Sequence, residues 1–184
     1  MKKRNKEVKM AKKLMVFLFT LMLCGGIYSQ SLAQMGFIIK KAIPSVENIA
    51  VIFPGKSFIK AKIEREARPA ILITKKKYTI FSVIAKSDLA QKISQIQKMD
   101  NVVVVVITDN TTLTPSAVQF IAQKTLEDQI PVISNRAKDT LQGALMSIFL
   151  EDTKIKKHLN KIIASALGIE FSEAFLSECS IDAE

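Results

Sequence analysis

The 184-residue chain is 48% hydrophobic and carries 27 basic and 17 acidic side chains, a net charge of +10 at pH 7. Seven of the basic residues and one of the acidic residues lie in residues 1–33, so the rest of the chain has a net charge of only +4. There is no Trp, and no stripe of Lys or Arg is interleaved with aromatic residues. This pattern excludes the usual classes of nucleic-acid-binding protein, and no nucleic-acid partner is expected.

The first 33 residues have the three parts of a secretory signal peptide. Residues 1–13 are rich in Lys and Arg, residues 14–28 are almost wholly apolar, and small residues stand at Ser31 and Ala33. We expect cleavage after Ala33 and export to the periplasm. The alternative is a membrane anchor retained through residues 14–28, although this run is shorter than the roughly 20 residues that span a bilayer.

The rest of the chain predicts one domain without disulfides. Residues 34–46 are expected to form an N-terminal extension and residues 47–184 a single α/β domain. Cys24 belongs to the leader, which leaves Cys179 alone and makes the fold depend on its hydrophobic core. The chain has a single His, His158, and no G-x-S-x-G or H-E-x-x-H motif. We therefore expect no enzymatic activity, no catalytic residues, no metal site and no cofactor.

The stretch VIFPGKS, residues 51–57, contains the Gly-Lys-Ser of a nucleotide-binding P-loop. The full motif requires a second Gly five residues before Gly55, where the sequence has Ala50. Pro54 in between has no backbone N–H to offer a phosphate. The stretch is therefore interpreted as a strand, a tight turn and a helix capped by Ser57.

Apolar runs and amphipathic stretches alternate along the domain. Runs of apolar and β-branched residues predict strands at ENIAVIF, YTIFSVIA, NVVVVVITDN and IPVIS, and the five consecutive Val residues are typical of a strand buried on both faces. The spacing of apolar residues predicts helices that begin at Ser57, at Ser87-Asp88 and at Thr114-Pro115. A short helical turn is expected from Lys138 to Gln142.

Two further features concern the first of these helices. Pro69 is expected to kink or split it, because proline lacks the N–H that the helix needs. The run Lys75-Lys76-Lys77 is interpreted as a solvated helix end, and contact with a membrane surface is the alternative.

The C-terminal part predicts a hairpin followed by two short helices. GALMSIFLEDTKIKKHLN is expected to turn at residues 151–154, because its apolar residues do not continue one helical face. Residues 160–167 predict a helix closed by Gly168 as its C-terminal cap, and residues 171–179 predict a last short helix.

This order of elements predicts the fold class. Alternating strands and helices indicate a three-layer α/β protein, flavodoxin-like, with a mostly parallel sheet of four or five strands and helices on both faces. In such sheets ligands bind outside the carboxyl ends of the strands. The candidate ligand-binding residues at those ends are Gly55, Lys56, Ser57, Asp109, Asn110, Thr111, Ser134, Asn135 and Arg136.

The chemistry expected of these residues is recognition. Lys56 and Arg136 suit an anionic group, and Asp109 and Asn110 suit hydroxyls or amines. The alternative for each residue is an ordinary role as a cap or a turn former. As a residue of a surface loop, Asp109 is expected to matter for binding and little for stability.

Three phrases of the sequence carry a resemblance to a known family. DNTTLTPSAVQFIAQKTLEDQIPVIS, GALMSIF and LNKIIASALGIEFSEAFL resemble the periplasmic substrate-binding components of ABC transporters with type I periplasmic-binding-protein lobes. The resemblance covers residues 101–176. It departs from the family at Ser172, where a Pro is usual, and in total length, because those proteins have two lobes and this chain has residues for one.

The resemblance implies a single type I lobe that binds a small molecule and docks on a membrane permease. A second resemblance, in length, signal peptide and C-terminal ending, is to the YfiR-like periplasmic regulators, and it implies a membrane signalling protein as the partner. Those regulators usually carry disulfide cysteines, which this chain lacks. A single lobe leaves its ligand edge open, so a homo-oligomer or a docked partner is expected to cover it.

Overall fold

The computed structural model describes residues 30–182, so the signal-peptide features before residue 30 lie outside the described part of the chain. The strands are β1 (Asn48–Pro54), β2 (Lys77–Val83), β3 (Val102–Val106), β4 (Val132–Ser134), β5 (Met146–Glu151), β6 (Lys154–Asn160) and β7 (Ser180–Asp182). The helices are α2 (Leu32–Ala42), α3 (Ser57–Thr74), α4 (Asp88–Ile96), α5 (Pro115–Leu126), the 3₁₀ helix η1 (Ala137–Gln142), α6 (Lys161–Ala166) and α7 (Glu173–Leu176).

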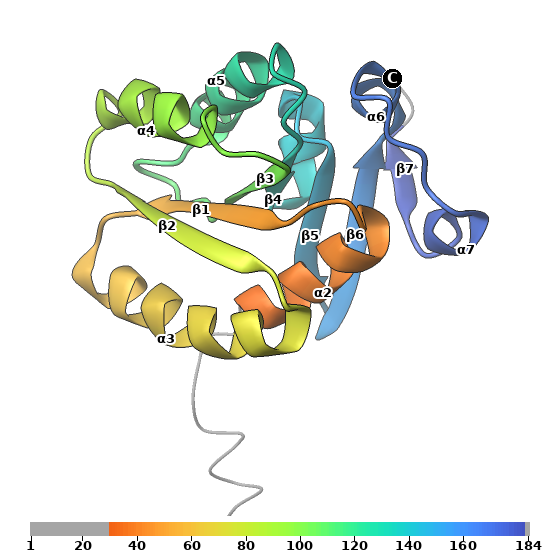
Figure 1. The fold of residues 1–184 in the computed structure, drawn as a ribbon, viewed down its shortest axis with the longest axis horizontal. Helices are drawn as coiled ribbons and strands as arrows, with labels where there is room; N and C mark the ends of the chain where they lie inside the picture. The colour runs from red at the N-terminus through yellow and green to blue at the C-terminus, as the bar shows by residue number, and fades with distance from the viewer. Residues whose placement is uncertain (1–29, 183–184) are drawn as a thin grey trace, which may run out of the picture.

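The strands form one sheet in the order β2-β1-β3-β4-β5-β6-β7, and the first five are parallel. The predicted three-layer α/β class is confirmed, with helices on both faces (Figure 1). The predicted count of four or five strands is wrong for the described residues, because the C-terminal part adds two more. The predicted hairpin brings β6 antiparallel to β5, and β7 extends the sheet beyond it.

Right-handed crossovers decide which helix covers which face. The step from β1 to β2 runs in one direction along the sheet, and the steps from β2 to β3 and from β3 to β4 run in the other. Because the crossovers share one hand, α3 lies on one face, while α4 and α5 lie on the opposite face (Figure 1). The apolar residues of α4 and α5 pack there on alternate residues of the central strands, including Ile52 and Val104.

The face of the sheet on which α3 packs, which we call the α3 face, is also covered by the N-terminal helix α2. The crossover from β4 to β5 contains only the short η1, which packs against α5 on the other face. Met35 and Ile39 of α2 fill the space, fully buried against Val103, Val105 and other residues of the sheet. Residues 34–46, expected to form an N-terminal extension, contain most of α2 and pack into the core on this face of the sheet.

The start of α2 is fixed by its own side chains. Ser31 and Gln34 form a capping box, in which each side chain accepts a hydrogen bond from the other residue's backbone N–H. Leu32 is buried in the core, and its N–H donates to Oε2 of Glu66 on α3, at 3.0 Å. The ordered fold thus includes the residues just before the expected cleavage point at Ala33.

The C-terminal residues close the same face as α2. Phe175 of α7 is buried in the α3-face core, and Gly168, with a φ of 61°, ends α6 as predicted. Glu178 contacts both Lys41 at the end of α2 and Lys157 of β6, with Lys41 Nζ at 2.6 Å. These two hydrogen bonds lower the pKa of Glu178 to about 2.

Two details of α3 differ from expectation. The helix continues unbroken through Pro69, because Pro69 and Arg65 four residues earlier are both exposed and water can satisfy the carbonyl that loses its partner. Its N-cap is Lys56, so the predicted cap, Ser57, is the first helical residue and caps nothing.

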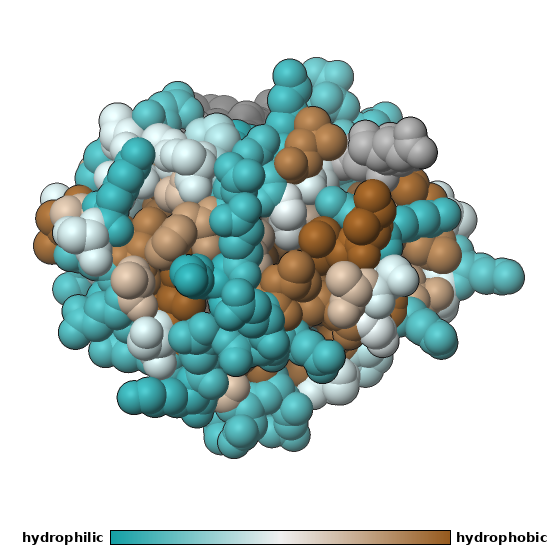
Figure 2. Space-filling view, turned by 90° about the horizontal axis from the view of Figure 1, so that it is seen from above, coloured by the Kyte–Doolittle hydropathy of each residue, from teal (hydrophilic) through white to brown (hydrophobic). Residues whose placement is uncertain are grey.

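The surface of the domain mixes polar and apolar groups. Figure 2 looks onto the α4 and α5 side, where apolar side chains remain exposed among polar ones. None of the helices in the described part of the chain combines the length and the hydrophobicity that crossing a bilayer requires.

Candidate functional site

The carboxyl ends of β1, β3 and β4 lie side by side at one edge of the sheet, as the sequence predicted. The loop after β1 carries Lys56, the loop after β3 carries Asp109 to Thr111, and the loop after β4 carries Asn135 and Arg136. These loops form the candidate site, which we call the carboxyl-end site.

The first two loops meet in one polar cluster. Lys56 Nζ lies 3.1 Å from Oδ2 of Asp109 and 3.2 Å from Oγ1 of Thr111, although 53 and 55 residues separate them in the sequence. The Lys56 and Thr111 side chains are exposed, and so is the neighbouring Asn110. The structure therefore brings Lys56, Asp109 and Thr111 together, with the exposed Asn110 between the last two in the chain.

Asp109 has a second role, which is to shape its own loop. Its Oδ1 accepts hydrogen bonds from the backbone N–H groups of Thr112 and Leu113, each at 2.7 Å, and its Oδ2 accepts one from the Thr111 hydroxyl. Partial burial by itself raises the pKa of Asp109. The hydrogen bonds from these groups and from Lys56 outweigh that effect and hold the pKa well below its usual range. The carboxylate is ionised at neutral pH and already satisfied within the loop.

The third loop is built on a buried ion pair. Asp139 of η1 is only 1% exposed and accepts hydrogen bonds from Ser134 Oγ and from Arg136 Nε, the latter at 2.8 Å. Arg136 Nη2 lies 2.7 Å from the same carboxylate. Ser134 and Arg136 therefore hold the loop together, and the predicted anion contact of Arg136 would compete with a buried carboxylate.

Asn135 joins the β4 loop to the end of β3. Its side-chain Oδ1 accepts hydrogen bonds from both the N–H and the hydroxyl of Thr108, each at 2.8 Å. This arrangement orients the amide, and its NH₂ group has no hydrogen bond to any of the described residues. Asn135 is thus a positioned donor at the site.

Gly55 allows the chain to pass close to β2, and Ser57 is the exposed first residue of α3. The N–H of Gly55 donates to the carbonyl of Val83 at 2.7 Å. A Cβ at this position would lie 2.8 Å from both Ile84 Cγ1 and Ser82 Oγ, so a larger residue would push β2 away. Glycine is needed here for close packing, and it places Lys56 over the neighbouring loop.

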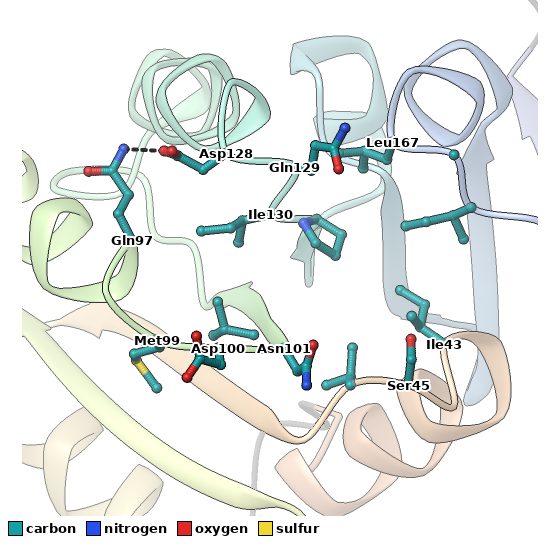
Figure 3. A pocket seen from close by; sticks show the side chains of 15 residues that line it. Ile43, Ser45, Gln97, Met99, Asp100, Asn101, Asp128, Gln129, Ile130 and Leu167 are labelled. Atoms are coloured by element: carbon teal, nitrogen blue, oxygen red, sulfur yellow. Dashed lines mark hydrogen bonds between the residues drawn. The ribbon is translucent and has the colours of Figure 1, made fainter.

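The carboxyl-end site is an exposed rim, and a hollow lies at the opposite edge of the sheet. A cavity of about 570 Å³ opens at the amino ends of the strands, between the carboxyl ends of α4, α5 and α6 (Figure 3). Its lining includes Ile43, Asn101, Ile130 and Leu167, and on one side Gln97 donates to Oδ2 of Asp128 at 2.7 Å. No motif in the sequence distinguishes this edge, because its residues come from separate turns.

Within residues 30–182, no three His, Cys, Asp or Glu side chains lie close enough to hold a metal ion. Cys179 Sγ donates to the carbonyl of Phe175 at 3.2 Å, and burial raises the pKa of its thiol. The ring of His158 packs edge-on against Phe149. Both side chains therefore make contacts within the domain.

Comparison with known proteins defines the class of fold. No protein-family model matches the chain, and no curated protein matches its sequence. Among solved structures, the ABC domain from Streptococcus pneumonia in complex with L-Trp has a TM-score of 0.71 at 19% identity. A ligand-free, open substrate-binding protein with adhesive properties from Clostridium difficile has a TM-score of 0.68 at 18% identity. A conserved domain protein from Vibrio cholerae O1 biovar El Tor has a TM-score of 0.69 at 19% identity.

These neighbours are longer than the chain. The alignments cover 82–83% of this chain but only 59–60% of each neighbour. At such low identity the likeness establishes the fold. The chain shares the three-layer α/β fold of these neighbours over 82–83% of its length.

Proposed function

We propose that this protein is an exported, non-catalytic binding protein that recognises a small solute at the carboxyl-end site. The observation that carries the proposal is the cluster of Lys56, Asp109 and Thr111, with Asn110 and Asn135 beside it, at the edge where open parallel sheets bind ligands. The groups it offers to a ligand are the Lys56 ammonium, which has a third N–H beyond its two hydrogen bonds, and the side-chain amides of Asn110 and Asn135. They suit a solute that bears a carboxylate and polar substituents, and a similar fold is known in complex with L-Trp.

An open rim binds weakly unless something covers it. Solute sites usually bury most of their ligand, and one lobe of this fold offers only one wall. We infer that a second copy of this chain or a membrane permease closes over the carboxyl-end site. The alignments cover only 59–60% of each structural neighbour, so each neighbour has a further part to which this chain is not aligned.

The same openness supports a second candidate function. A YfiR-like regulator would use the rim to bind the periplasmic domain of a membrane signalling protein, and a flat polar edge suits a protein partner. Neighbouring genes for a permease and an ATPase would favour the solute function. A neighbouring gene for a diguanylate cyclase would favour the regulator.

Titration calorimetry of the purified protein with the twenty amino acids and with small carboxylic acids tests the solute function. We expect binding of at least one compound, and loss of that binding in Lys56→Ala and Asn135→Ala. The matched control is Lys161→Ala, which removes an exposed lysine at the start of α6, at the amino ends of the parallel strands and so at the opposite edge of the sheet. Binding that survives both site changes would contradict the proposed site.

Export is part of the same proposal, and it concerns the N-terminus of the mature protein. The capping box of Ser31 and the burial of Leu32 support a mature N-terminus at or before Ser31, because cleavage after Ala33 would remove both groups. Intact-mass measurement of protein recovered from the periplasm and from the membrane tests this point. A mature chain that starts at Gln34 and is as stable as the longer form would contradict it.

A further inference from the structure

The outward face of α3 combines exposed apolar side chains with basic ones. Phe58 is 71% exposed, Leu72 75% and Ile73 54%. Arg65 and Arg68 lie between them on the same side of the helix, since residues three, four and seven apart share a face. Neither arginine has an acidic partner among the described residues.

The basic character increases at the end of the helix. Lys75, Lys76 and Lys77 follow α3 directly, and together with Ile71 and Leu72 they line a groove of about 470 Å³. Lys76 Nζ donates to the carbonyl of Pro44, whereas Lys75 and Lys77 are exposed. The groove is therefore apolar on one side and cationic on the other.

The acidic residues of α3 are directed elsewhere. Glu64 and Glu66 pair with Lys60 and Lys62 along the helix, and Glu66 also accepts the N–H of Leu32. Each of these glutamates is balanced by a lysine, so the outward face keeps a net positive charge among its apolar residues. This is the composition of helices that lie in the interface of a bilayer with anionic lipids.

The path of the chain leads to this same helix. Leu32 contacts Glu66 in the middle of α3, and the apolar run of residues 14–28 ends four residues before Leu32. Four residues reach at most roughly 14 Å. Whenever the apolar run lies in a bilayer, α3 is therefore held within about that distance of the membrane surface.

We propose that the outward face of α3, with Lys75 and Lys77, docks on the surface of an anionic phospholipid bilayer. Phe58, Leu72 and Ile73 enter the interface, and the arginine and lysine side chains contact lipid phosphates. In Figure 1, α3 lies along the lower side of the molecule, whereas the carboxyl-end site lies at an edge of the sheet. Apart from its control position, the test below changes only residues at the carboxyl end of α3 and directly after it, and none of the carboxyl-end site, so the two proposals stand or fall separately.

Photo-crosslinking of the full chain tests the docking. A benzophenone amino acid replaces Leu72 in one variant and Ile73 in a second, so that the result does not depend on one geometry. Leu141 is the matched control, because it is also an exposed leucine, at 61%, but belongs to η1 on the opposite face of the sheet. Each variant is reconstituted into vesicles of phosphatidylcholine with or without phosphatidylglycerol, irradiated, and analysed by mass spectrometry for lipid adducts.

We expect phospholipid adducts at positions 72 and 73 in phosphatidylglycerol vesicles, and few at position 141. Lys75→Gln with Lys77→Gln should reduce the adducts about fivefold for each charge removed. Equal adducts at positions 72 and 141, or none at either 72 or 73, would overturn the proposal. So would adducts to protein alone, which would identify this face as a protein interface, and adducts that do not depend on phosphatidylglycerol.

Discussion

Replacing Asp109 by Ala is expected to destabilise the protein, although Asp109 lies in a surface loop. The change removes an acceptor that holds two backbone N–H groups at 2.7 Å, the Thr111 hydroxyl and the Lys56 ammonium. Water replaces part of these bonds because the loop is at the surface. The expected loss is about 2 kcal/mol, the upper range for a lost capping side chain. For a domain of this size that corresponds to a fall in Tm of roughly 4–8 °C.

Thermal unfolding followed by circular dichroism measures this effect, with two comparison variants. Asp109→Asn keeps a neutral oxygen for the two N–H groups and should lose about half as much stability. Asn110→Ala changes the exposed neighbouring residue and should stay within about 0.5 kcal/mol of the unaltered protein. If Asp109→Ala is as stable as Asn110→Ala, the loop is held by other contacts, and the role assigned to the carboxylate is refuted.

The dependence on pH gives an independent check. The pKa of Asp109 is lowered in the folded protein, so its stabilising effect is complete above the ordinary value near 3.8 and is lost as the pH falls below it. The difference in Tm between the unaltered protein and Asp109→Ala should therefore be constant near neutrality and should shrink below about pH 4. A difference that grows in acid would contradict the assigned direction of the shift.

Three further predictions concern the fold. Ile39→Ala should lower the Tm by roughly 5–15 °C because Ile39 is fully buried, whereas Phe37→Ala on the exposed side of α2 should change it little; equal effects would contradict the packing of α2. Gly55→Ala should cost about 1–3 kcal/mol in urea unfolding, since its Cβ would lie 2.8 Å from Ser82 Oγ, and an unchanged midpoint would mean that β2 yields freely. Glu178→Gln should flatten the fall of Tm between about pH 4.5 and 2, because protonation of Glu178 in this range removes the stabilising effect of its ion pairs. An unchanged pH profile would argue against those pairs.

The elements that the sequence predicts well are those with a strong local pattern. Five consecutive Val residues specify a central strand, and Thr114-Pro115 marks the start of α5 at the residue where it begins. β7 could not be anticipated, because a strand of three residues exists only through its pairing with β6. Helix α2 had a signal in the sequence, a capping box at Ser31 and Gln34, but the same residues also fit a signal-peptidase site.

The candidate site was predictable in its position but less so in its internal bonds. Strand order in a parallel sheet brings Lys56 and Asp109 to one edge, and this follows from topology. The sequence does not predict the pairing of Arg136 with Asp139. Their spacing of three residues is a weak signal until burial removes the alternative of solvation.

The closure of the α3 face by both ends of the chain has a consequence for the order of folding. Met35 and Ile39 are among the first of the described residues to emerge from a ribosome or a translocation channel, yet they share their core with Phe175. Lys41 likewise cannot form its hydrogen bond until Glu178, 137 residues later in the chain, has emerged. Since contacts so distant in sequence form late, the face stays open until nearly the whole chain has been delivered. A chain that cannot complete its core part-way is suited to passage through a channel in an unfolded state.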